Sequence, residues 1–395
     1  MNQLRIAFSW PKKHREHRFN SGVSLHSHTL HSLESLCFID QVTGNVPFLS
    51  SLIRREKAKV RAVRGCDLDL KNAWWTPPLS ARQAWELERS QIVHSLGLHA
   101  LVSLSDHDNI EAGLNLQVLE ETRACPISIE WSVPFGPTFF HVGVHNLPVD
   151  SAVTMTRAMN QFTAAPHEGG IAPLLEYLAE AAGSLLVLNH PAWDENHIGD
   201  AQHAACLDGF MTRFGRFLHA LELNGLRPWS ENLKAIHVAE RFGLPVVSGG
   251  DRHGREPNAC VNLTAARTFA EFAAELREGA GSDILFFPQY QQSLKMRVFE
   301  NVVDILKQDP NHALGWHHWT KRVLYRSDTG NVKSLDELCG GQFPSIVNRL
   351  ELVRRLVESG AVKSALRYAL HEKEEFALQP ARPLYALSFQ QVDHD

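Results

Sequence analysis

The stretch Val23-Ser24-Leu25-His26-Ser27-His28 places two histidines directly after a short strand-like run. Residues two apart in a strand point to the same side, so His26 and His28 are expected to project together from one strand end. Three further fragments repeat this arrangement: Ser105-Asp106-His107-Asp108, Asn189-His190-Pro191 and Gly250-Asp251-Arg252-His253. Imidazoles and carboxylates that converge from several strand ends predict a divalent-metal site, which usually supports hydrolysis.

The composition is that of an ordinary soluble globular protein, with 44% hydrophobic and 21% charged residues. A length of 395 residues suggests two to three domains, or one barrel with an appendage. The formal net charge is −5. Proteins that bind long nucleic acids non-specifically normally carry a basic excess, so we do not expect a polymeric nucleic-acid partner. The sequence leaves open whether the protein has a local basic patch.

The cysteines and the N-terminus indicate a cytoplasmic protein. Six dispersed cysteines without a C-x-x-C pair are typical of reduced thiols. The first 20 residues contain basic side chains but no apolar core of a secretory signal. No stretch approaches the roughly 18 consecutive apolar residues of a membrane span. We therefore expect no membrane contact, and the sequence leaves the oligomeric state open.

Short apolar runs alternate with helical patterns through the first part of the chain. Strands are expected over residues 23–25, 98–104, 127–131, 139–144, 184–188, 217–223 and 244–247. Helices are expected over residues 81–96, 109–122, 174–182 and 230–242. This strand–helix order predicts a parallel α/β sheet or barrel, with the active site at the carboxyl ends of the strands.

Two segments break this order. Residues 33–78 separate the first histidine pair from the next helix, and we interpret them as an insertion over the mouth of the barrel. The insertion carries a basic run over residues 54–64, which is either a phosphate-binding element or a solvated helix face. From about residue 291 helical patterns dominate, over residues 293–307, 312–324, 345–358 and 362–375. We expect a barrel over residues 1–290 and a mainly helical C-terminal region over residues 291–395.

Asp106 and His107 follow an apolar strand and precede a helical pattern. Asp108 suits the role of a helix N-cap. A cap does not explain Asp106 and His107 together, because a carboxylate beside an imidazole suits either metal ligation or the orientation of a ligand. His31, three residues after the first histidine pair, is either a further ligand or, as we favour, a solvated loop residue.

Glu130 interrupts an apolar run over residues 127–131. A carboxylate there is costly unless it is exposed or paired, so Glu130 is either on an exposed edge strand or bridges two cations. His141 opens the next apolar run and is a ligand candidate. His145, four residues later, is a candidate pocket residue.

His190 and Asn224 end two further strands. Pro191 restricts His190 to an extended conformation, which would aim its imidazole reproducibly. Glu222 and Asn224 are candidates to orient a ligand or to contact substrate, although Asn224-Gly225 could equally form a structural turn.

The fragment Ser248-Gly249-Gly250-Asp251-Arg252-His253-Gly254 is the most specific single motif. Its glycines allow close backbone approach, and Asp251 and His253 share a face. Arg252 and Arg255 lie beside them and could grip an anionic oxygen.

In this order, the motifs resemble those of the PHP family (polymerase and histidinol phosphatase domain). The family has an H-x-H motif, a D-H pair, an internal Glu, a His opening a later strand, a His-Pro and a final D-x-H. The matching residues are His26, His28, Asp106, His107, Glu130, His141, His190, Asp251 and His253. The resemblance covers about residues 22–257. It implies a distorted (β/α)7 TIM-like barrel in which these residues hold two or three divalent ions, Mn²⁺, Zn²⁺ or Fe.

The resemblance implies hydrolysis of a small phosphomonoester or nucleotide by a metal-activated hydroxide. His107 or another unligated histidine is the candidate to protonate the leaving oxygen, with Asp106 and Arg252 as further catalytic candidates. The candidates for substrate binding are Arg252, Arg255, His31, His145 and Asn224. The insertion is longer than the family's usual spacing, and the C-terminal region lies outside the motif set.

Three alternatives stay open. The first is a 3′-5′ exonuclease acting on short oligonucleotides, because Trp74 and Trp75 could stack on bases, although local packing would also explain them. The second is amidohydrolase-like C–N hydrolysis, which usually needs a bridging modified lysine that the motif strands lack. The third is a non-catalytic metal-stabilised interaction module. A near-complete ligand set argues against this last alternative, because structural zinc sites rarely need more than four ligands.

Overall fold

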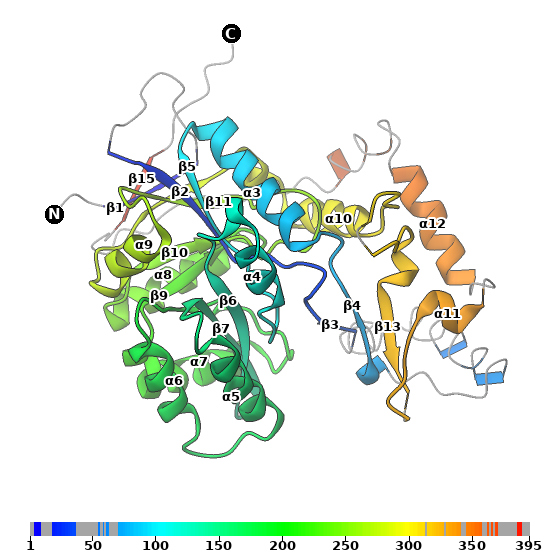
Figure 1. Cartoon of the computed structure of the whole chain (residues 1–395), viewed down its shortest axis with the longest axis horizontal. Helices are drawn as coiled ribbons and strands as arrows, with labels where there is room; N and C mark the ends of the chain where they lie inside the picture. The colour runs from blue at the N-terminus through cyan, green and yellow to red at the C-terminus, as the bar shows by residue number, and fades with distance from the viewer. Residues whose placement is uncertain are drawn as a thin grey trace, which may run out of the picture.

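The computed structural model describes most of the chain and shows a mixed α/β fold built on three sheets (Figure 1). The described residues are 4–8, 18–36, 54–55, 58, 61–62, 70–312, 314–327, 329–340, 345–357, 362, 365, 368–369 and 385–388.

A six-stranded sheet has the order β15-β1-β12-β11-β2-β5, and a five-stranded sheet has the order β10-β9-β8-β7-β6. The strands of the first are β1 (Leu4–Ala7), β2 (Ser21–Leu25), β5 (His99–Ser103), β11 (Cys260–Thr264), β12 (Asp283–Phe286) and β15 (Tyr385–Ser388). Those of the second are β6 (Ile127–Phe135), β7 (Thr138–Leu147), β8 (Leu185–Leu188), β9 (Ala220–Asn224) and β10 (Val246–Gly249).

The expectation of purely parallel strands is wrong at β7, which runs antiparallel to both β6 and β8. The reason is the connection between β6 and β7, which consists of Gly136 and Pro137 alone. A two-residue turn can only reverse the chain, whereas a parallel crossover needs a dozen or more residues. Gly136 adopts a φ of +59°, which glycine tolerates without strain.

The two sheets meet at their strand ends. Past the end of β10, the Gly250 amide donates to the Leu25 carbonyl of β2 (3.0 Å). Past the end of β5, the Asp106 carbonyl accepts from the Glu130 amide of β6 (3.0 Å). These bonds bring the ends of β2, β5 and β10 next to the middle of β6, and the histidine motifs lie there. The closed seven-stranded barrel stays a prediction.

Helices cover the sheets, as Figure 1 shows. The expected helices over residues 81–96 and 230–242 are confirmed, with the second starting one residue earlier. Ser80 and Gln83 form a capping box at the start of α3, and Gly97 ends it with a φ of +69°. The helices of this body are α3 (Ala81–Leu96), α4 (Glu111–Gln117), α5 (Ala152–Ala164), α6 (Ile171–Glu180), α7 (Asp200–Phe214), α8 (Trp229–Phe242) and α9 (Phe269–Arg277).

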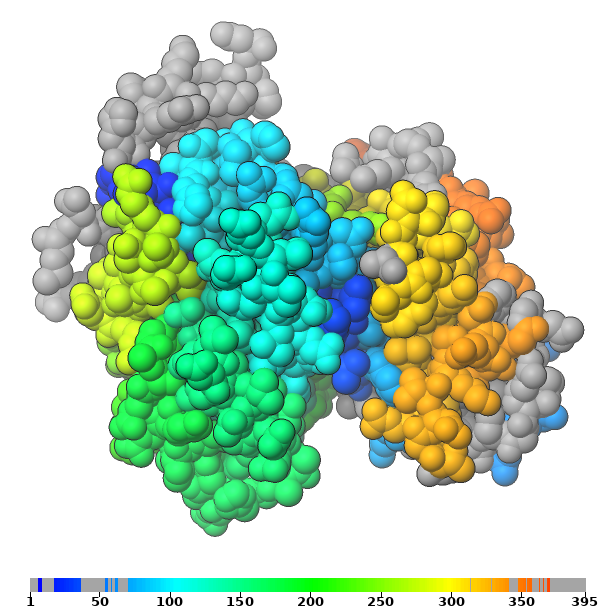
Figure 2. Space-filling view, in the orientation of Figure 1, coloured from blue at the N-terminus to red at the C-terminus, as the bar shows by residue number. Residues whose placement is uncertain are grey.

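A third sheet joins the insertion to the C-terminal region. Its order is β14-β13-β4-β3. The strands are β3 (Glu34–Ser35), β4 (Ala73–Trp75), β13 (Val323–Arg326) and β14 (Val332–Ser334). In Figure 2 the orange C-terminal residues and the green body form two lobes, with blue N-terminal residues between them. Of the basic run, Arg54, Arg55 and Arg61 are exposed, and the other members lie outside the described residues.

The C-terminal region is less helical than expected. Its helices are α10 (Leu294–Ile305), α11 (Leu335–Cys339) and α12 (Ser345–Val357). The helix expected over residues 312–324 is wrong, because Gly315 takes a φ of +68° and Leu324 pairs with Trp74 of β4. Residues 362–375 lie mostly outside the described residues, and the domain boundary near residue 290 stays a prediction. Within the described residues, no helix has the length and apolar character needed to cross a membrane.

Candidate metal centre

Glu130 lies at the centre of a cluster of histidines. It belongs to β6 and is fully buried. Its burial rules out the exposed edge position, and the interpretation that Glu130 bridges two cations stays a prediction. The histidine nitrogens nearest to Oε2 are His26 Nε2 (3.0 Å), His107 Nδ1 (3.2 Å) and His28 Nε2 (3.3 Å), and those nearest to Oε1 are His190 Nε2 (3.1 Å) and His141 Nδ1 (3.4 Å).

Glu34 completes the cluster from the side of the insertion, and the sequence analysis missed it. Its Oε2 lies 3.2 Å from His253 Nε2 and 3.4 Å from His107 Nε2. Its Oε1 accepts a hydrogen bond from Ser32 Oγ (2.6 Å), which fixes the carboxylate. Glu34 lies in the two-residue strand β3, which is too short to produce a hydrophobic period. The only sequence signal was an acid six residues after His28.

Three groups of side chains offer ligand atoms that all lie within 4.8 Å of one another. The groups are His28, Glu34, His107 and His253; His26, His28 and Glu130; and His107, Glu130 and His141. His28, His107 and Glu130 each belong to two groups.

Several of these atoms lack the hydrogen bonds that buried polar atoms normally make. Within the described residues, His26 Nε2, His28 Nε2 and Glu130 Oε2 are buried and make none. They lie close together, but their orientation does not satisfy hydrogen-bond geometry. Leaving such a group unpaired costs about 1–3 kcal/mol. Nitrogen and carboxylate donors that converge on one point, unsatisfied by each other, fit divalent metal ions such as Zn²⁺, Mn²⁺ or Fe²⁺.

The electrostatics hold His28 and Glu130 in their metal-binding forms. At His26 and His107, burial is outweighed by the neighbouring carboxylates, which raise the pKa of His26, and that of His107 to about 9, so these two imidazoles would release a proton to bind metal. Burial, helped by the neighbouring His253, lowers the pKa of His28 to about 3, so its imidazole is neutral. Burial alone would raise the pKa of Glu130, but His26 and His107 hold it well below its usual value. Neutral imidazole and ionised carboxylate are the forms that bind metal.

Glu222 orients two of the histidines from behind. Its Oε1 lies 2.6 Å from His26 Nδ1, and its Oε2 accepts from the His190 amide (2.8 Å). With Nδ1 engaged by a carboxylate, the His26 Nε2 lone pair is directed at the cluster. A Cβ at Gly249 would collide with Glu222 Oε1, so glycine is required there. Asn224 donates to Glu222 Oε2 (2.9 Å), which places Asn224 behind the cluster rather than in contact with a substrate.

Asp251 borders the cluster, whereas Asp106 does not take part in it. Asp251 Oδ1 lies 3.4 Å from His28 Nε2 and 3.7 Å from His26 Nε2. Asp106 accepts from both the amide and the hydroxyl of Thr29, the latter at 2.7 Å. The structure therefore places Asp106 as an anchor of the turn after His28, and its carboxylate belongs to none of the three ligand groups.

Backbone conformation at the site differs from the strand geometry expected. His26, His190 and Asp251 have φ angles of +62°, +27° and +55°, which non-glycine residues rarely adopt. The chain thus leaves strand geometry at His26, and Pro191 does not hold His190 extended as predicted. Such strain costs about 1–3 kcal/mol per residue and is concentrated at functional sites.

Arg252 is placed differently from the prediction. Its guanidinium donates to Glu88 Oε1 (2.9 Å) and to the carbonyls of Gly254 (2.8 Å) and His28 (3.1 Å). The Arg252 guanidinium is therefore paired within the protein and directed away from the cluster. Its position does not support a catalytic role. Glu88, on α3, also accepts from Ser27 Oγ (3.3 Å) and so connects the turns that carry His26, His28 and His253.

We expect Glu88→Ala to destabilise the protein by about 3–5 kcal/mol, because it leaves the Arg252 guanidinium buried and unpaired. Thermal or chemical denaturation measures the change. Glu86→Ala is the matched control, since Glu86 lies on the same helix and pairs with Arg89 at the surface. Surface pairs contribute at most about 1 kcal/mol. Equal losses in the two variants would contradict the role assigned to Glu88.

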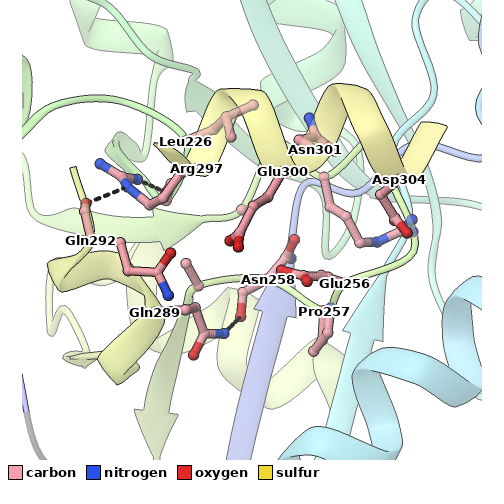
Figure 3. A pocket seen from close by; sticks show the side chains of 14 residues that line it. Leu226, Glu256, Pro257, Asn258, Gln289, Gln292, Arg297, Glu300, Asn301 and Asp304 are labelled. Carbon is pink, nitrogen blue, oxygen red and sulfur yellow. Dashed lines mark hydrogen bonds between the residues drawn. The ribbon is translucent and has the colours of Figure 1, made fainter. Parts of the chain in front are cut away.

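Arg252 also lines a small pocket of about 70 Å³ beside α10. Figure 3 shows this pocket, in which Arg297 contacts the Gln292 carbonyl and Gln289 contacts the Asn258 carbonyl. The pocket lies outside the cluster, because its lining includes none of the clustered histidines.

The other predicted substrate residues lie outside the site. Arg255 pairs with Asp309 (3.1 Å), and His31 pairs with Glu111 (3.0 Å) at the surface. His145 is buried beside Ser103 (2.8 Å), where burial lowers its pKa to about 3. None of them lines the cavity that opens above the cluster.

A cavity of about 740 Å³ opens above the cluster. Trp75 of the insertion and α10 of the C-terminal region contribute to its wall, as does the loop after β8. The ring centroid of Trp75 lies 5.9 Å from that of His253, so the insertion reaches the cluster. The wall also includes Phe139, Trp193, Glu195 and Arg227.

No family model matches the sequence, and no curated protein matches it. Three solved structures are similar in part. PsfC from Pseudomonas syringae PB-5123 is 15% identical, with a TM-score of 0.37, over 71% of this chain and 96% of that one. A proposed metal-dependent phosphoesterase from Bifidobacterium adolescentis is 19% identical, with a TM-score of 0.30, over 46% and 85%. An amidohydrolase from Chromobacterium violaceum, with bound sulfate and no metal, is 14% identical, with a TM-score of 0.36, over 51% and 92%.

Proposed function

We propose that the protein is a metal-dependent phosphoesterase of the PHP type that hydrolyses a small phosphomonoester. The observation that carries the proposal is Glu130, a buried carboxylate whose two oxygens are shared by histidines from five separate positions. The hydrogen bonds between β10 and β2 and between β5 and β6 support the (β/α)7 arrangement that this family implies.

The three ligand groups would hold two or three divalent ions. When bound, such ions supply Lewis-acid chemistry, which makes water nucleophilic near neutral pH and stabilises charge on a phosphoryl oxygen. Glu222 keeps His26 in the tautomer that presents Nε2 to the cluster. Trp75, Phe139 and Trp193 form apolar parts of the cavity wall, which exclude water from a bound substrate.

Glu195 is the best-placed general acid. His107 was the candidate from the sequence, but both of its nitrogens face carboxylates of the cluster, at 3.2 Å and 3.4 Å. Glu195 lines the cavity and makes no hydrogen bond or ion pair with the other described residues. Burial raises its pKa, so its carboxyl group holds a proton at higher pH than usual. A protonated carboxyl group beside the substrate can neutralise the leaving oxygen.

We expect Glu195→Gln to lower kcat for alkyl phosphates by about 10²–10⁴-fold. The effect should be small for 4-nitrophenyl phosphate, because its leaving group needs no proton. Wild-type activity on alkyl phosphates should fall as the pH rises through the pKa of Glu195, and the variant should lack this limb. An equal loss on both substrates would contradict the assignment.

The proposed function is tested with purified protein loaded separately with Mn²⁺, Zn²⁺ or Fe²⁺. The substrates are phosphomonoesters, nucleotides, short oligonucleotides and amides, and activity should disappear after treatment with a chelator and return with metal. Turnover of amides alone would overturn the proposal in favour of C–N hydrolysis. No lysine lines the cavity among the described residues, which argues against that outcome. No turnover with any metal would favour a non-catalytic module.

A further inference from the structure

Arg227 is fixed on the cavity wall by an aromatic ring. It lies in the loop between β9 and α8, and its guanidinium carbon is 3.3 Å from the ring centroid of Trp193. Trp193 in turn packs edge-on against His190, with ring centroids 5.2 Å apart. Cation–π stacking of this kind holds the planar guanidinium in one orientation next to the cluster.

The hydrogen-bonding capacity of Arg227 is incompletely used. Its Nε is buried and has no hydrogen-bond partner among the described residues. Its Nη2 lies 3.4 Å from Asp251 Oδ2, which is long compared with the roughly 2.7–2.9 Å of a strong charge-assisted bond. A permanently charged group at a cavity wall whose ion pair is this long is suited to an incoming anion.

Arg227 is also isolated among acids. It is the only arginine or lysine among the described residues that line the cavity, whereas Glu34, Asp108, Glu195 and Asp251 also line it. Apart from bound cations, the wall therefore offers one fixed positive charge to a phosphate dianion.

We propose that Arg227, held flat on Trp193, binds the oxygens of the phosphate group that is hydrolysed. This inference rests on the proposed function for the identity of the anion. Asp251 connects Arg227 to the cluster, because its Oδ2 faces Arg227 while its Oδ1 lies 3.4 Å from His28 Nε2. Only the Asp251 carboxylate therefore separates an anion on Arg227 from the ligand groups. This position suits the phosphate that is hydrolysed rather than a second phosphate elsewhere on the substrate.

The test measures binding of inorganic phosphate to the Zn²⁺-loaded protein by calorimetry, with zinc content determined in parallel. We expect Arg227→Gln to weaken phosphate binding by about 10- to 100-fold at unchanged zinc content, because a charge-assisted bidentate contact is lost. Arg227→Lys should bind phosphate with an affinity between those of the wild type and Arg227→Gln. Lysine keeps the positive charge but lacks the planar guanidinium that makes two parallel hydrogen bonds. KM for phosphomonoesters should rise in parallel.

Arg326→Gln is the matched control. Arg326 also lies over a tryptophan, 5.3 Å from the ring centroid of Trp74, but it does not line the cavity, so its variant should bind phosphate as the wild type does. Unchanged phosphate affinity in Arg227→Gln would overturn the inference. If that variant loses zinc or does not fold, Arg227→Lys decides: wild-type affinity at full zinc content overturns the inference, and weaker binding supports it.

Failure of the proposed function has a different signature. Phosphate binding that depends on Arg227, in a protein that hydrolyses no phosphoester, would support the anion site and overturn the proposed function. Phosphoester hydrolysis with the same KM and the same phosphate affinity in Arg227→Gln as in the wild type would support the proposed function and overturn the anion site.

Discussion

Glu130→Gln should lower kcat/KM for a phosphomonoester by at least about 10³-fold and reduce the number of bound metal ions. Glu130 belongs to two of the three ligand groups, so its replacement affects both. Glutamine keeps the shape of the side chain but removes the negative charge. It also places an amide N–H₂ group, which cannot bind metal, among imidazoles.

Metal content by mass spectrometry and steady-state kinetics on the same preparation check this prediction. Glu222→Gln is an informative comparison, because Glu222 contacts His26 from behind and belongs to none of the ligand groups. Loss of such an orienting group typically costs about 10–100-fold, so its effect should be smaller. Glu86→Gln, at the surface, should have no effect. If Glu130→Gln retained full metal content and activity, the central role of Glu130 would be refuted.

Much of the cluster was predictable because its residues interrupt or end apolar runs. A carboxylate within the run over residues 127–131 had to be exposed or paired, and the structure buries Glu130 and pairs it with His26, His107 and their neighbours. The ordered motifs then required only that the strand ends meet, which the bonds between β10 and β2 achieve.

The arginines show where sequence proximity misleads. Arg252 was a candidate because it lies between Asp251 and His253. In a local alternation, however, the middle residue faces away from its neighbours. Arg252 accordingly points to Glu88, as does Ser27 between the first two histidines. Arg227 was missed because it lies in a loop without periodicity, and its role depends on stacking with a distant tryptophan.

The fold was predictable where elements have their own local signals. The capping box at Ser80 and the αL glycine after α3 mark that helix in the sequence. By contrast, the third sheet depends on the pairing of β13, in the C-terminal region, with β4, in the insertion, and β3 pairs with the other edge of β4. Pairings between segments separated by more than 200 residues leave no local pattern, so the third sheet could not be anticipated.

Glu34→Gln should remove one metal ion and leave the others in place. Glu34 belongs to only one ligand group, with His28, His107 and His253, whereas Glu130 belongs to the other two. The Glu34 carboxylate is ionised, because His253 and His107 lower its pKa and outweigh the opposing effect of burial. Replacing it with a neutral amide should therefore lower the affinity for one ion by at least about 10–100-fold, which is the loss typical when a group that orients a metal ligand is replaced.

Metal titration of the ion-free protein measures this effect. The wild type should show one binding step more than Glu34→Gln, and Glu130→Gln should show fewer steps than either. Ser35, the neighbour of Glu34 in β3, is exposed, so Ser35→Ala should retain every step. If Glu34→Gln bound the full complement of ions with wild-type affinity, the insertion would contribute only to the wall of the cavity. The expected loss would instead make the insertion part of the metal centre, because Glu34 lies in a strand that pairs with β4 and, through it, with the C-terminal region.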